Sequence, residues 1–80
     1  MSQFEKLLQK IKNNPKQVSF EELEKILRRL GFEVRQPRGG SSHYVFLKGP
    51  KQISIPKHGK HVKVIYVEQV IETLKEEGVM

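Results

Sequence analysis

The chain has 80 residues, no cysteine and a formal net charge of +6. A chain of this length has room for one hydrophobic core, and a composition of 36% hydrophobic and 30% charged residues is typical of a folded protein rather than a disordered one. Without cysteine, disulfides and thiolate metal sites are excluded. Since no apolar run is long enough for a signal peptide or a membrane span, we expect a cytoplasmic protein that does not bind a membrane.

Positive charge is concentrated in the middle of the chain. Residues 28–63 carry nine lysines and arginines against one acid, Glu33, which leaves +8, whereas residues 64–80 have a net charge of −3. This distribution is typical of a surface that binds a polyanion, because each Lys or Arg near a phosphate releases condensed counterions. A solvated basic surface without a ligand is the alternative on charge alone. A membrane-surface role is disfavoured because the basic stretch lacks helical periodicity.

Two helices are expected at the start of the chain. Apolar residues recur at i, i+3, i+4 and i+7 within residues 4–11, and this helix should end near Pro15, which disfavours helical geometry in the residue before it. The second helix has a clear beginning, because Ser19 suits the N-cap and Glu22 completes a capping box. It should end at Gly31, where a left-handed C-terminal cap is favoured.

Three short antiparallel strands and a closing helix are expected next. The strands, marked by alternating or β-branched and aromatic residues, are predicted at residues 32–36, 42–48 and 52–55, separated by turns at 37–41 and 49–51. Apolar residues return at helical spacing from Val67 to Leu74, in a helix that should stop at Gly78. The order of helix, helix, three strands and helix predicts an α+β domain with helices on one face of a small sheet.

Three short motifs follow one another at a defined spacing. They are Leu30-Gly31-Phe32, Gly40-Ser41-Ser42-His43-Tyr44-Val45-Phe46 and Ile53-Ser54-Ile55-Pro56-Lys57-His58. From about residue 19 to 79 the chain resembles the HicA toxin family, in which a glycine and a serine are followed within two residues by the functional histidine and then by an aromatic residue. Gly40, Ser41, His43 and Phe46 meet this pattern.

The resemblance implies a fold and a division of the chain. The family fold is similar to the double-stranded-RNA-binding domain, a helix, a three-stranded antiparallel sheet and a helix. Here an extra N-terminal helix precedes it. We therefore expect residues 1–18 to be a helical extension, and residues 19–80 to form the RNA-binding and nuclease domain as a single globular unit.

The same resemblance implies an endoribonuclease toxin that cleaves mRNA and is neutralised by a HicB-type antitoxin protein. His43 would be the general base or acid, because histidine titrates near neutrality and RNA supplies its own nucleophile, the 2′-hydroxyl. Cations would hold the RNA and stabilise the developing phosphorane charge. The candidates are Arg35, Arg38, Lys48, Lys57, Lys60 and Lys63. Without the resemblance, a histidine that simply packs on a half-exposed strand is the alternative.

Strand alternation predicts the two faces of the second strand. His43, Val45 and Leu47 share one face, and Phe46 lies on the other. If Phe46 is in the core, Val45 and Leu47 form an apolar patch beside His43, which an antitoxin would cover. The alternative is that a curved sheet or the N-terminal helix buries both side chains.

Neither a metal nor a small-molecule cofactor is expected. His58 and His61 supply at most two ligands, and neither a cysteine nor an acid lies between His43 and His61 to complete a site. Two other functions remain open: a non-catalytic RNA-binding module that uses the same basic surface, and a basic protein-interaction domain for an acidic partner.

Overall fold

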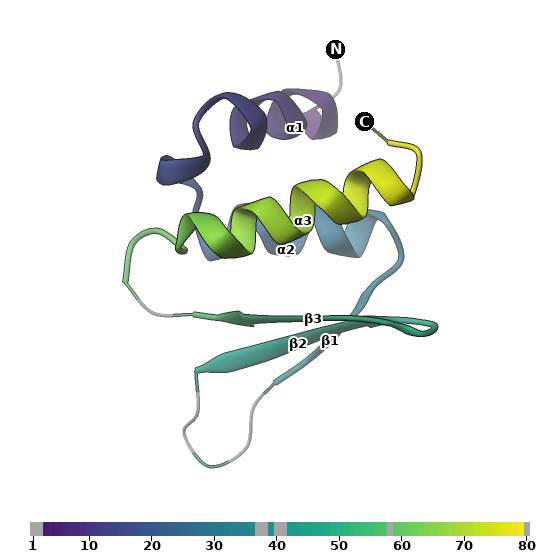
Figure 1. Cartoon of the computed structure of the whole chain (residues 1–80). Helices are drawn as coiled ribbons and strands as arrows, with labels where there is room; N and C mark the ends of the chain where they lie inside the picture. The colour runs from purple at the N-terminus through teal and green to yellow at the C-terminus, as the bar shows by residue number, and fades with distance from the viewer. Residues whose placement is uncertain (1–2, 37–38, 40–41, 58, 80) are drawn as a thin grey trace.

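The computed structural model describes residues 3–36, 39, 42–57 and 59–79 (Figure 1). The elements in chain order are α1 (Gln3–Asn13), the short 3-10 helix η1 (Pro15–Gln17), α2 (Phe20–Arg29), β1 (Glu33–Arg35), β2 (His43–Lys48), β3 (Lys51–Pro56) and α3 (Val64–Glu76). The strands form one antiparallel sheet in the order β1-β2-β3. The fold is therefore α+β, with the helix, sheet and helix arrangement of a double-stranded-RNA-binding domain and an extra N-terminal helix, as predicted.

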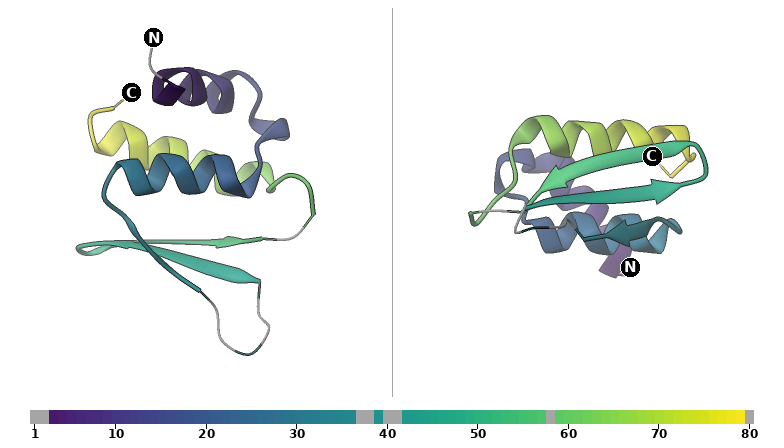
Figure 2. Two further views of the ribbon diagram at one scale, coloured as in Figure 1. Left: turned by 180° about the vertical axis from the view of Figure 1, so that it is seen from behind. Right: turned by 90° about the horizontal axis from the view of Figure 1, so that it is seen from below.

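The elements are arranged in layers. Both α2 and α3 lie on the same side of the sheet, and α1 lies beyond them, on the side away from the sheet (Figure 1). The view from behind shows the same order of layers, and the view from below shows the sheet in front of the helices (Figure 2). The opposite face of the sheet is not covered by any helix of the described residues. None of these helices is long and apolar enough to cross a lipid bilayer.

Helix α1 is part of the hydrophobic core. Its residues Leu8 and Ile11 are buried in the same cluster as the apolar side chains of α2, α3 and the sheet. The Nζ atom of Lys10 also lies 2.6 Å from the carboxylate of Glu22 in α2. The helix ends before Pro15, as expected, but the 3-10 turn that begins there was not predicted.

Helix α2 begins and ends as its sequence predicts. The hydroxyl of Ser19 accepts a hydrogen bond from the backbone N–H of Glu22 (3.3 Å), whose carboxylate accepts one from the N–H of Ser19 (2.9 Å). Burial raises the pKa of Glu22, but hydrogen bonds from Lys10 and Ser19 lower it by a larger amount. The pKa of Glu22 is therefore below its ordinary value. At the other end Gly31 has a φ of 97°, and the N–H of Phe32 donates to the carbonyl of Leu27 (3.0 Å), which closes the helix and directs the chain into β1.

The strands differ slightly from the predicted bounds. The first is shorter than expected because Phe32 is used in closing α2. The third is longer than expected, because only Gly49 and Pro50 form the turn and Lys51 already pairs with Lys48. Helix α3 buries Val67, Val70 and Leu74 of its predicted apolar stripe, leaves Ile71 half-buried, and stops before Gly78, whose φ is 74°.

Candidate nucleic-acid interface

The uncovered face of the sheet, which we call the outer face, carries three rows of side chains. Residues that are directly paired across antiparallel strands point to the same side of a sheet. The rows are His43 with Pro56; Arg35, Val45 and Ser54; and Glu33, Leu47 and Gln52. Because Phe46 on the alternate side of β2 is fully buried against the helices, the rows lie on the side away from them.

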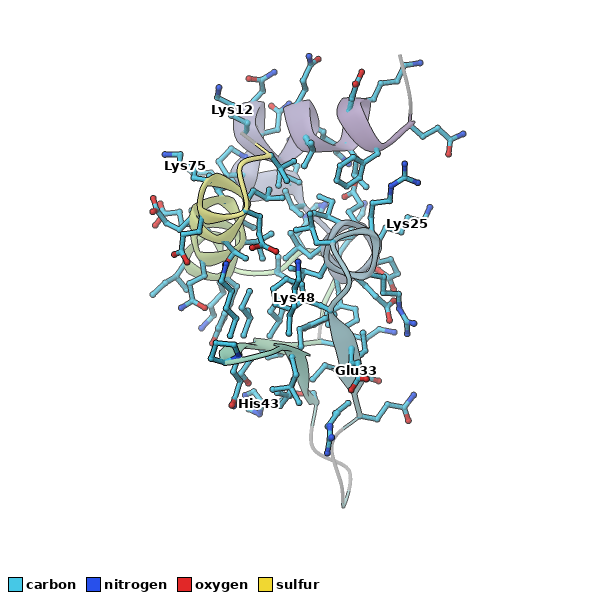
Figure 3. All side chains as sticks on the ribbon, turned by 90° about the vertical axis from the view of Figure 1, so that its right-hand side faces the viewer. Lys12, Lys25, Glu33, His43, Lys48 and Lys75 are labelled. Atoms are coloured by element: carbon cyan, nitrogen blue, oxygen red, sulfur yellow. The ribbon has the colours of Figure 1, made fainter. Side chains whose placement is uncertain are left out.

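His43 is the first residue of β2 and is exposed. Figure 3 shows its side chain and that of Glu33 on the side of the sheet away from the helices, whereas Lys48 points toward the helices. Residues 40 and 41 of the predicted motif lie outside the described residues, as do Arg38 and His58. The position of His43 agrees with the faces predicted from strand alternation, and His43 is not part of the hydrophobic core cluster of the described residues.

Lys57 lies at the same end of the sheet as His43. Its backbone N–H donates a 2.7 Å hydrogen bond to the carbonyl of Ser42, which holds the end of β3 beside the start of β2. Its Nζ atom lies 5.3 Å from the ring centroid of Phe20 and 5.9 Å from that of Tyr44. A carboxylate oxygen of Glu21 is 3.7 Å from the same atom. These contacts place the Lys57 ammonium on the helix side of the sheet, where its charge remains accessible.

Arg35, Lys60 and Lys63 are exposed, and none of them has an ion pair with another described residue. Arg35 lies diagonally from His43 across β1 and β2, a relation that brings Cα atoms to about 7–8 Å. Lys60 and Lys63 belong to the loop before α3. This loop is anchored at Val62, which is buried and donates a 2.9 Å backbone hydrogen bond to the carbonyl of Val18.

Lys48 is placed differently from the other predicted RNA-binding residues. It lies at the far end of β2, where its ammonium and that of Lys51 both bind the carboxylate of Glu77, the latter at 2.8 Å. Hydrogen bonds from Lys48 and then from Lys51 lower the pKa of Glu77 to about 2. Lys48 also lies 5.9 Å from the ring centroid of Phe32. The structure therefore does not bring Lys48 together with His43. Instead, Lys48 and Lys51 connect the β2–β3 hairpin to the end of α3.

Val45 and Leu47 are half-buried on the outer face, and neither belongs to the hydrophobic core. Helix α1 does not cover them, because it lies on the other side of α2 and α3 (Figure 1). The apolar patch that strand alternation predicts beside His43 is thus present. Its polar neighbours Gln52 and Ser54 were not singled out from the sequence, although they alternate with the buried residues of β3.

Other parts of the described surface are less suited to RNA. A hollow of about 440 Å³ on α3 contains two acids, Glu68 and Glu72, against one cation, Lys75, so its net charge disfavours phosphate; Ile65, Gln69 and Ile71 complete its lining. Over the described residues, which exclude His58, no group of three histidine, aspartate or glutamate side chains is placed to hold a metal ion.

The fold and the site together define a class of protein: a small basic domain with the layers of a double-stranded-RNA-binding domain and an exposed histidine on its open sheet face. Residues 20–76, more than half of the chain, match the family model described as HicA toxin of bacterial toxin-antitoxin. The chain therefore belongs to the HicA toxin family and is the toxin that pairs with an antitoxin. A comparison with curated proteins and one with solved structures gave no match.

Proposed function

We propose that this toxin is an endoribonuclease that cleaves mRNA, with His43 as its general base or acid. The observation that supports this most directly is the position of His43: exposed, on the uncovered face, and diagonal to Arg35 on the same face. A proton-transferring group and cations at one place are what RNA cleavage requires of a protein.

The chemistry needs no nucleophile from the protein. His43 removes the proton of a ribose 2′-hydroxyl, the 2′-oxygen attacks the adjacent phosphorus, and the bond from phosphorus to the 5′-oxygen breaks as that oxygen takes up a proton. The products are a 2′,3′-cyclic phosphate and a 5′-hydroxyl. Arg35, on the same face as His43, stabilises the charge on the phosphorane, while Lys60, Lys63, Arg38 and Lys57, whose ammonium lies on the helix side of the sheet, bind flanking phosphates.

Replacement of His43 tests this function. We expect His43→Ala to lower the rate of RNA cleavage by about 10²- to 10⁴-fold, the usual contribution of general acid–base catalysis, and to relieve growth arrest in cells without antitoxin. Circular dichroism should show an unchanged fold, because the side chain is exposed. His61→Ala, a change of another exposed histidine, is the matched control and should retain cleavage.

Two results of this experiment would contradict the proposal. Full activity of His43→Ala would place the chemistry at another residue. Cleavage by the wild type that is lost in EDTA would instead require a metal ion, with His58 and His61 as candidate ligands.

The apolar patch suggests how the toxin is neutralised. We propose that a HicB-type antitoxin covers Val45 and Leu47 and thereby blocks access to His43. The double variant Val45→Ser with Leu47→Ser should bind the antitoxin more weakly in a pull-down with purified proteins, yet remain folded. Unfolding of this variant would show that these side chains stabilise the core, and unchanged capture would place the antitoxin elsewhere.

A further inference from the structure

The third row of the outer face, Glu33, Leu47 and Gln52, has no role in the chemistry described above. We propose that it is a base-recognition site, in which Glu33 and Gln52, on either side of Leu47, bind the polar edges of an unpaired RNA base that rests on Leu47. The site would determine which sequences are cleaved. This inference rests on the proposed function, since it assigns sequence preference to the same RNA-binding face.

The position of the row relative to His43 is set by strand geometry. Residues on one face of a strand are two apart, and a strand rises about 3.3 Å per residue, so the Val45 row lies about 7 Å and the Leu47 row about 13 Å from His43. A single strand of RNA whose scissile phosphate is at His43 therefore crosses the Val45 row first. A base near the cut then reaches the Leu47 row.

The two polar side chains of the third row have unused hydrogen-bonding capacity. Glu33 and Gln52 are exposed, and neither side chain has a hydrogen bond or ion pair with another residue of the described chain. Leu47 between them is half-buried and supplies an apolar floor. Proteins that recognise single-stranded RNA commonly combine hydrogen bonds to base edges with stacking of bases on aromatic rings or on Arg guanidinium planes. Here Leu47 supplies an apolar contact, and the guanidinium of Arg35 in the neighbouring row offers a plane for stacking.

The charge of Glu33 indicates what this row binds. It is the single acid among residues 28–63, and it lies on the face that carries Arg35 and His43. A carboxylate repels phosphate, so this row is not a backbone contact; it accepts hydrogen bonds from a donor. The amide of Gln52 both donates and accepts. We therefore expect a preference at this position for a base with an exocyclic amino group over uracil.

The test compares cleavage of a pool of short single-stranded RNAs in which one position near the cut is varied. For the wild type we expect a preference for amino-bearing bases at one fixed position. Gln52→Ala and Glu33→Gln should each reduce that preference by about tenfold, within the usual contribution of a base-edge contact. Gln9→Ala, a change of an exposed glutamine on α1, is the matched control and should keep the preference.

Several outcomes would overturn the inference. An unchanged preference in both variants, while cleavage persists, would exclude the row from base recognition. Variants that alter capture by the antitoxin but leave the cleavage pattern intact would assign the row to the antitoxin instead. If the wild type cleaves no RNA, the proposed function itself fails; fluorescence anisotropy with the same RNAs then tests the base preference separately, and equal affinities for all four bases would reject it.

Discussion

The two faces of the same small sheet are used in different ways. On the inner face, Phe46 is fully buried and its ring centroid lies 5.9 Å from that of Phe20, so that β2 is packed firmly beneath α2. On the outer face, the alternate residues of β2 begin with the exposed His43 and continue with half-buried side chains. A single strand thus contributes every second residue to stability and leaves the others available for binding.

Cationic residues show the same division. Lys48 on the inner face binds Glu77 and lies near Phe32, whereas Arg35 on the outer face has no ion pair with a described residue. A count of positive charges along the sequence treats these two side chains alike. In this small basic protein, therefore, part of the positive charge stabilises the fold, and only the remainder is available to a polyanion.

The largest expected difference between the faces is in stability. Phe46→Ala should lower the free energy of unfolding by about 3–5 kcal/mol, because it removes a buried aromatic side chain and leaves a cavity. Val45→Ala on the outer face should cost much less, since its side chain does not belong to the core. Chemical denaturation of both variants measures this. Similar losses would show that the two faces contribute equally to folding.

RNA binding should depend on the outer face of the sheet more than on the inner face. Arg35→Ala is expected to lower the affinity for single-stranded RNA and to make the slope of log affinity against log salt shallower by about 0.7, the value for one phosphate contact. Lys48→Ala should leave that slope nearly unchanged, because its ammonium is bound to Glu77. Anisotropy titrations at several salt concentrations compare the two. A larger change of slope for Lys48→Ala would reverse the assignment.

The smallest expected effect concerns acid stability. The pKa of Glu77 is lowered from 4.5 to about 2 in the folded protein, so its contribution to stability is present above pH 4.5 and is lost as the pH falls toward 2. Glu77→Gln should therefore be less stable than the wild type at pH 7, and its stability should depend less on pH between 5 and 2.

Thermal unfolding followed at several pH values tests this effect. Glu68→Gln is the control, because the Glu68 carboxylate is exposed and has no ion pair with a described residue. A wild-type profile that matches that of Glu77→Gln would show that the two lysines do not stabilise the ionised carboxylate.

Local signals account for the part of the structure that was predictable. Three predictions that depend only on neighbouring residues were confirmed. They are the capping box of Ser19 and Glu22, the glycine that ends α2, and the alternation of β2. The binding of Lys48 to Glu77 joins residues 29 apart, which no local pattern reveals. The rows of the outer face likewise depend on strand register, which sets Gln52 beside Leu47.

The acidic residues near the end of the chain should affect how the protein is oriented when it approaches a polyanion. Residues 64–80 carry a net charge of −3 and include α3 (Val64–Glu76), whereas the positive residues between 28 and 63 include those at the His43 end of the sheet. The separation gives the molecule an electric dipole, which turns it in the field of an approaching polyanion before any contact is made. Productive encounters are therefore expected to be most frequent at low ionic strength. At 0.15 M salt, where charges are screened beyond about 8 Å, the toxin should lose part of this advantage in association rate.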